Sequence, residues 1–178
     1  MGSVSPSGRR RWFRLAPPVL ALGLLIAGPA ALAAPSPTVT CPLEAKDGAT
    51  FLSLDGLDAR IVAELMRRFS APATMSIAEI VAPRDAEWQV TDVVMPGQPL
   101  LGRRFIQGGR AGTRWYVWYE SGGIAHQYHA AIFDLPPAAP APHLVTHIDG
   151  SLDQLCPVTR AQLIAHPAEA AQPDRGFW

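Results

Sequence analysis

The sequence predicts an α+β domain in which one N-terminal helix packs on a four- to five-stranded antiparallel meander, with a short C-terminal helix and one disulfide. Three observations support this prediction. Apolar residues recur with a helical period over residues 55–69. Alternating, β-branched segments separated by short breaks fill residues 88–148. Two cysteines stand far apart in the chain.

The chain begins with the features of an export signal. Residues 1–14 contain four arginines and no acidic residue, and residues 19–27 (VLALGLLIA) are apolar. An A-x-A sequence at residues 31–33 provides the small residues that a signal peptidase reads. Residues 10–13 (RRWF) resemble a twin-arginine signal, so the general and twin-arginine routes both stay open. An uncleaved anchor is the alternative, but this apolar run is far shorter than the roughly 20 residues of a spanning helix.

We predict a signal peptide over residues 1–33, cleavage between Ala33 and Ala34, and a periplasmic or secreted protein. The 15 basic and 15 acidic residues of the chain cancel, but the predicted signal removes four arginines. The mature chain then keeps 11 basic and 15 acidic residues, a formal charge of −4. This charge argues against nucleic acid as a partner, because backbone phosphates attract basic proteins. No other segment predicts a membrane span after cleavage.

The two cysteines, Cys41 and Cys156, predict one disulfide if the chain reaches an oxidising compartment. The bond would join the two ends of a single domain over residues 34–166, with residues 167–178 as a flexible tail. Closing a loop of about 100 residues stabilises a fold by up to about 4.7 kcal/mol. Two free thiols or a catalytic thiol are the alternatives.

The strongest helical pattern covers residues 55–69. Its apolar positions follow four-residue steps: Leu57, Ile61, Leu65 and Phe69. Asp55 or Asp58 can cap the first turn. We expect the apolar stripe to pack on the sheet.

Five segments predict the strands: 88–94, 100–107, 114–120, 124–135 and 143–148. The glycine-rich breaks at 108–112 and 121–123 predict hairpin loops, and the proline-rich residues 136–142 predict an extended loop. Residues 75–81 fit a short helix or a strand. Residues 156–166 predict the C-terminal helix, with Pro157 in its first turn.

Centring the two hairpins on Arg110 and Gly122 divides the predicted sheet into two faces. The more apolar face, expected to pack on the helix, comprises Phe105, Trp115, Val117, Tyr119, His129, Ala131, Phe133 and Leu135. The opposite face contains aromatic residues with polar tips, which are common in binding surfaces. It predicts a ligand-binding surface made of Arg104, Tyr116, Trp118, His126 and Tyr128. Ordinary cross-strand pairing is the alternative explanation for these residues.

Histidines near the end of the predicted sheet provide an alternative, metal-binding hypothesis. His143 and His147 share a strand face, and His129 becomes a diagonal neighbour of His147 if the loop before His143 is centred near Ala139. A carboxylate such as Asp149 could complete a metal site with them. Without a fixed third ligand, our default expectation is that they are polar rim residues and that no metal or cofactor is bound.

Function is the least determined feature of the sequence. It contains no nucleophile elbow, phosphate-binding loop or dinucleotide fingerprint. The leading hypothesis is an exported, non-catalytic binding or interaction domain, whose partner is an unidentified ligand or protein of the cell envelope. The alternative is a small cell-envelope hydrolase or metal-dependent enzyme that uses His129, His143 and His147. A purely structural component of the envelope is a third option.

Overall fold

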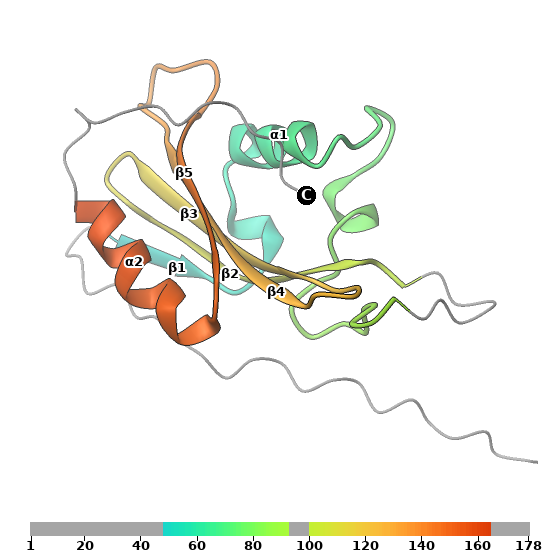
Figure 1. Ribbon diagram of the computed structural model, residues 1–178. Helices are drawn as coiled ribbons and strands as arrows, with labels where there is room; N and C mark the ends of the chain where they lie inside the picture. Colours follow the sequence, from blue (N-terminus) through green and yellow to red (C-terminus); the bar gives the residue numbers. More distant parts are fainter. Residues whose placement is uncertain (1–47, 93–99, 165–178) are drawn as a thin grey trace, which may run out of the picture. The chain divides into compact units, whose positions relative to one another are not determined.

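The computed structural model describes residues 48–92 and 100–164 (Figure 1). A five-stranded antiparallel sheet is accompanied by two α-helices, so the α+β class and the antiparallel sheet are confirmed. The strands are β1 (Gly48–Phe51), β2 (Arg103–Ala111), β3 (Arg114–Ser121), β4 (Gln127–Asp134) and β5 (His143–Gly150). The helices are α1 (Ala59–Arg68) and α2 (Leu152–Ile164). Each strand pairs with the next along the chain, which makes the sheet a meander.

Several sequence predictions fall outside the described residues. These are the signal peptide over residues 1–33 with its cleavage between Ala33 and Ala34, Cys41, and the tail over residues 167–178. Cys156 lies half-buried in α2, whereas its predicted partner is not described, so the disulfide stays a prediction. None of the described helices is long and apolar enough to cross a bilayer.

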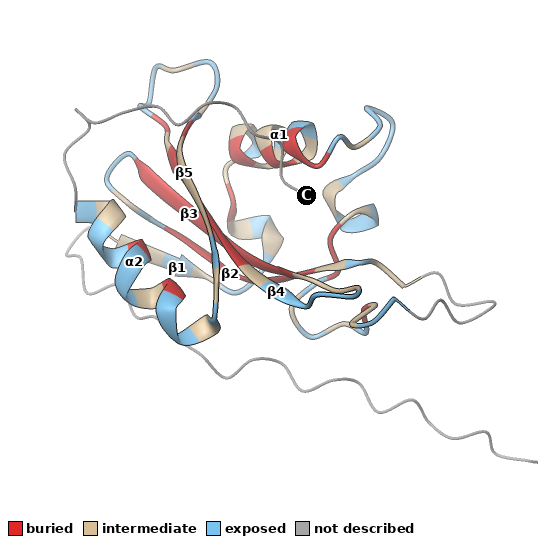
Figure 2. Ribbon diagram, viewed as in Figure 1, coloured by how far each residue is buried: buried red, intermediate tan, exposed pale blue. Residues whose placement is uncertain are grey.

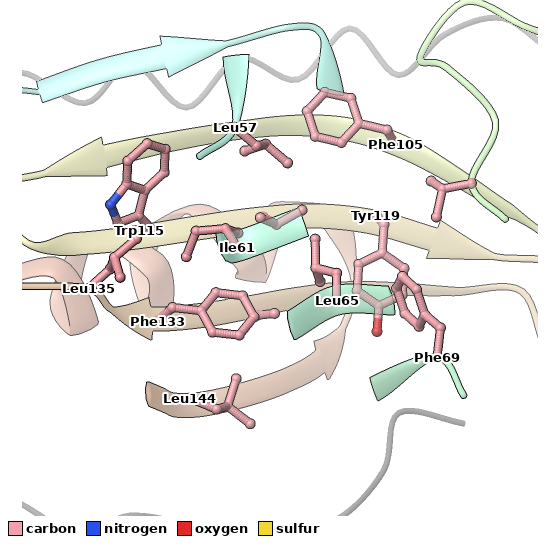
Figure 3. Close-up of a cluster of buried hydrophobic side chains, with 13 residues drawn as sticks. Leu57, Ile61, Leu65, Phe69, Phe105, Trp115, Tyr119, Phe133, Leu135 and Leu144 are labelled. Atoms are coloured by element: carbon pink, nitrogen blue, oxygen red, sulfur yellow. The ribbon is translucent and has the colours of Figure 1, made fainter. Parts of the chain in front are cut away.

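Helix α1 forms near the predicted position but is shorter than residues 55–69. A 3₁₀ turn, η1 (Leu54–Gly56), precedes it, and the carboxylate of Asp58 caps α1 by accepting a hydrogen bond of 2.9 Å from the backbone N–H of Arg60. The four apolar positions of the stripe are all buried. They belong to one core cluster with residues of β2, β3, β4 and β5, as Figure 3 shows.

This cluster contains the sheet residues predicted for the more apolar face, with one exception. The residues are Phe105, Trp115, Val117, Tyr119, Ala131, Phe133 and Leu135. The exception, His129, is also buried but is polar and hydrogen-bonded. Figure 2 shows the buried positions concentrated along the central strands and on one side of α1.

The opposite face of the sheet is covered by α2. Leu155 of α2 belongs to a second core cluster with Ile106, Tyr116, Trp118 and other sheet residues. The helix begins at Leu152, earlier than predicted, and Pro157 lies inside it rather than in its first turn. The sequence prediction missed this start because α2 lacks the regular apolar stripe that marks α1.

The predicted strand over residues 88–94 is wrong for its described part, since residues 88–92 form no strand. They instead cap one end of the sheet, where the Gln89 N–H donates to the carbonyl of Leu101 and the Gly123 N–H donates to the carbonyl of Val90. Trp88 is buried there, which accounts for its apolar position in the pattern. One edge of the sheet is β1, which pairs with the end of β2 and was not predicted. Residues 75–81 contain a 3₁₀ turn, η2 (Ile77–Glu79).

The predicted loop over residues 108–112 is also wrong, because β2 continues to Ala111. The chain turns at Gly112, whose φ of +59° favours glycine. Gly109 lies within the strand, and a Cβ there would lie 2.4 Å from the ring of Tyr116 and 2.5 Å from the carbonyl oxygen of Ala49. This glycine therefore leaves room for the Tyr116 ring and for the backbone of β1 rather than forming a turn.

The predicted strand register is shifted, but the assignment of faces is correct. Trp118 pairs with Ala130 rather than with His126, because the β3–β4 connection is longer than predicted and Ser121 pairs with Gln127. Phe105 pairs with Tyr119 rather than with Trp115. Both shifts are even up to Phe105, so the residues assigned to the two faces stay on their predicted sides. A β-bulge between Phe105 and Gln107 makes the shift odd for the rest of β2.

Candidate functional site

The predicted aromatic surface is not an open surface, which corrects the expectation drawn from the sequence. Tyr116 and Trp118 have 0 % of their surface exposed because α2 covers them, and Arg104 is also buried. The indole Nε1 of Trp118 donates a hydrogen bond of 2.9 Å to the hydroxyl of Thr159 in α2. These contacts place Tyr116 and Trp118 in the core and remove them from a ligand-binding surface.

The remaining predicted residues meet around a carboxylate that the sequence argument overlooked. Glu120 is buried and pairs with Arg104 at 2.5 Å and with Nε2 of His126 at 2.7 Å. The ring of His126 lies 4.8 Å from that of Tyr128 and 5.6 Å from that of Trp88, measured between centroids. Arg104 already pairs with this carboxylate, and its guanidinium lies over the ring of Trp88. The charged groups of the cluster therefore have partners within the protein, at the rim of the sheet.

A second polar cluster lies on the other face, at the same end of β3. His147 and Asp149 are two residues apart on β5 and therefore point to the same side, while His129 of β4 pairs directly with Asp149. Nδ1 of His129 lies 2.6 Å from Oδ1 of Asp149, and Nε2 of His147 lies 3.6 Å from the same oxygen. One ligand atom from each of the three residues lies within 4.8 Å of the others. The diagonal arrangement of His129 and His147 predicted from the sequence is confirmed, since His147 pairs with Ala131.

Residues of β3 support the two imidazoles from behind. The hydroxyl of Tyr119 lies 3.0 Å from Nε2 of His147, and Oγ of Ser121 lies 2.8 Å from Nε2 of His129. The ring of Tyr119 stacks on His129 with a centroid separation of 4.7 Å, and His129 stacks on His147 at 5.4 Å. The rings are therefore held in fixed orientations, and neither Tyr119 nor Ser121 was predicted as a site residue.

Burial determines the protonation of this cluster. It lowers the pKa of His129, and it lowers the pKa of His147 to about 4, because a buried imidazolium loses its hydration. It also raises the pKa of the Tyr119 hydroxyl. Both histidines are therefore neutral at pH 7. Since a carboxylate only accepts hydrogen bonds, the N–H of His129 is at Nδ1 and points to Asp149, and Nε2 accepts from Ser121.

The connectivity from Ser121 through His129 to Asp149 is that of an acyl-transfer triad. Such chemistry also needs hydrogen-bond donors for the oxyanion, most simply the backbone amides beside the nucleophile. The amides of Gly122 and Gly123 instead donate to the carbonyls of Gly102 and Val90. Two neutral imidazoles and a carboxylate, by contrast, are ligands that zinc commonly takes.

His143 does not join this cluster, which corrects the three-histidine set considered from the sequence. It lies at the opposite end of β5, where it pairs with Asp134 and is exposed. Four residues of strand separate it from His147, roughly 13 Å at ordinary strand rise. The third ligand candidate is Asp149, whose position two residues after His147 was the available sequence signal.

A surface hollow of about 560 Å³ offers less chemistry. Its lining comes from residues 52–55, 77–78 and 83–86, none of which belongs to the histidine cluster. Its one basic residue, Arg84, donates a hydrogen bond to the carbonyl of Ile106. No set of polar side chains converges on it comparable to the one at His129.

Comparison with known proteins leaves the residues themselves as the basis for a functional argument. The chain matches no family model, no curated protein and no solved structure.

Proposed function

We propose that this protein is an exported binding domain whose ligand is a divalent transition metal ion, held by His129, His147 and Asp149. The observation that supports the proposal is the spacing of the three side chains, each of which offers a ligand atom within 4.8 Å of the others. Two histidines and a carboxylate form a ligand set typical of Zn²⁺, with a further position for water or another ligand.

The hydrogen-bond partners of the cluster favour metal binding. Nδ1 of His129 can become a ligand if its proton moves to Nε2, where Oγ of Ser121 accepts it at 2.8 Å. This change of tautomer keeps the imidazole neutral and gives it an outer hydrogen-bond partner, as is usual for metal-binding histidines. Tyr119 stands beside Nε2 of His147, where its hydroxyl can reorient towards a ligand of the metal. Half of the Asp149 side chain (53 %) is exposed, which allows an ion to enter.

Isothermal titration of the metal-free protein with Zn²⁺ tests the proposal. We expect saturable binding of one ion at micromolar or lower concentration, and loss of that binding in His147→Ala and Asp149→Ala. His143→Ala is the matched control, since it removes a histidine from the same strand outside the cluster. Absence of heat at micromolar zinc, or equal loss in the His143 control, would contradict metal binding at this site.

The proposal of export is supported by the basic residues 1–14, the apolar residues 19–27 and the A-x-A sequence that follows. Expression in a bacterial host with N-terminal sequencing of the product tests it, and a mature chain that begins at Ala34 is the expected result. A product found in the cytoplasm with residues 1–33 still attached would contradict export.

The disulfide between Cys41 and Cys156 is the corresponding proposal about the exported state. Mass spectrometry after alkylation without reduction tests the pairing. We expect no alkylated thiol and one cross-linked peptide pair. Two alkylated cysteines in the exported protein would contradict it.

A further inference from the structure

A positively charged side chain lies next to the histidine cluster without an anionic partner. Arg103 pairs with Ser121 across β2 and β3, which places it on the same face of the sheet as His129. Its Nε is buried and has no hydrogen-bond partner, and no ion pair to Arg103 is found among the described residues. A buried guanidinium N–H without an acceptor is uncommon in folded proteins, because its desolvation is not compensated.

The position of this guanidinium is set by α1 and by the cluster. Its Cζ lies 4.6 Å from the ring centroid of Phe69, which in turn meets Tyr119 edge-on at 5.2 Å. Burial raises the pKa of Tyr119 and the charge of Arg103 opposes it, whereas burial lowers the pKa of His129 and the charge of Arg103 adds to that effect. The side chain is therefore held at the border of the cluster and is close enough to contribute to it electrostatically.

We infer that the site takes a small oxyanion, a carboxylate or phosphate group, bound between Arg103 and the metal ion. The inference rests on the proposed metal function. A divalent ion, the carboxylate of Asp149 and the guanidinium of Arg103 together leave a net charge of +2, which an anion would reduce. The guanidinium is suited to this role, because its planar array of N–H donors matches the oxygens of carboxylates and phosphates.

Titration of the metal-loaded protein with simple anions tests this inference. Co²⁺ replaces Zn²⁺ as the metal, since its visible spectrum changes when an anion enters the coordination sphere. Inorganic phosphate and acetate are added separately, so that the response identifies which oxyanion is preferred. We expect a saturable spectral change, and binding weakened by about tenfold or more in Arg103→Gln, the loss typical of a charge-assisted hydrogen bond.

Two controls keep a folding defect from imitating the result. Arg103→Gln keeps a long side chain over Phe69, so its thermal unfolding should match that of the wild type. Its Co²⁺ affinity should be no weaker than that of the wild type, because the variant removes a positive charge beside the ion. Arg110→Gln removes a charge from the same strand, at an exposed position over Trp115, and should bind the anion normally.

Failure of the inference is distinguishable from failure of the proposed function. Metal binding without an anion response, or an equal response in Arg103→Gln, overturns the oxyanion inference and leaves metal binding intact. If no metal binds, the proposed function is overturned. Calorimetry with phosphate on the metal-free protein then tests whether Arg103 binds an anion without a metal. Saturable binding that Arg103→Gln abolishes would then support the anion site, and its absence would overturn it.

Discussion

The indole N–H of Trp118 and the hydroxyl of Thr159 share a hydrogen bond of 2.9 Å that fastens α2 to the sheet. Trp118 lies in the middle of β3, and Thr159 is 41 residues later in the chain. Both side chains have 0 % exposed surface, so neither group can exchange this partner for water. Together with the apolar packing of Leu155, this contact keeps a face with several polar aromatic residues in the interior.

Replacing Thr159 with Val should destabilise the fold by about 1–3 kcal/mol, because the buried indole N–H loses its acceptor while side-chain volume is kept. The free energy of unfolding from urea denaturation measures the change. Thr159→Ser keeps the hydroxyl and should lose less. Equal stability of the Thr159→Val variant and the wild type would show that the hydrogen bond contributes nothing.

Replacing Trp118 with Ala should cost about 3–5 kcal/mol of stability, the range for removing a large buried aromatic side chain. A residue in a ligand-binding surface would not show a loss of this size. Ile124, which is 92 % exposed at the tip of the same hairpin, provides the control, and Ile124→Ala should change stability by no more than about 0.5 kcal/mol. A Trp118→Ala protein whose midpoint of urea denaturation is unchanged would contradict the burial of this face.

The stability of the metal-free protein should fall as the pH is lowered from about 6.5 to about 4. In this window an unfolded histidine with its ordinary pKa of 6.5 binds a proton, whereas His147 stays neutral in the folded protein until about pH 4. The unfolded state therefore gains protons first, at up to about 1.4 kcal/mol per pH unit for one such group.

Urea denaturation at several pH values, with a chelator present, measures this dependence. His147→Gln should reduce the slope between pH 6.5 and pH 4, and the exposed His143→Gln should leave it unchanged. An identical slope in wild type and His147→Gln would mean that His147 titrates alike in the folded and unfolded states.

Replacing Asp58 with Ala should destabilise the fold by about 0.5–2 kcal/mol at pH 7, through loss of the cap of α1. The side-chain hydrogen bond from Arg60 holds the pKa of Asp58 below its ordinary value of 3.8. The contribution of this carboxylate is thus present above pH 3.8 and is lost as the pH falls through the lower, folded-state pKa. Thermal unfolding of both proteins at pH 7 and near pH 2 checks this, and a difference that persists undiminished in acid would argue against a carboxylate cap.

The local spacing of apolar residues was sufficient to predict α1 and the central strands. The four-residue spacing from Leu57 to Phe69 predicts both the helix and its buried side, since helix geometry alone brings these residues together. Alternation along β3 similarly separates Trp115 and Tyr119 from Tyr116 and Trp118. The division into two faces remained correct despite the shifted register, because the shifts were even up to Phe105 and no residue beyond the β-bulge in β2 had been assigned to a face.

Local pattern was insufficient where a distant segment completes an element. Gly109 resembles a turn residue, but it leaves room for the Tyr116 ring and for the backbone of β1, which pairs with β2 from far away in the sequence. Residues 88–92 alternate like a strand, yet they bond to the sheet at only a few backbone groups. Short-range periodicity does not reveal whether a neighbouring strand is present to receive these hydrogen bonds.

The candidate site divides in the same way. The spacing of His147 and Asp149 on one strand, and the presence of His129 on the strand before it, follow from residue order and strand period. Placing His129 beside Asp149 required the pairing of β4 with β5, and the alignment of Ser121, Tyr119 and Arg103 required the pairing of β3 with both neighbours. The alternation of side chains along a strand is a property of the local chain. Strand register and the covering of a sheet face by a helix depend instead on which long-range packing has the lowest free energy. Only the tertiary structure therefore distinguishes the buried face from the polar cluster.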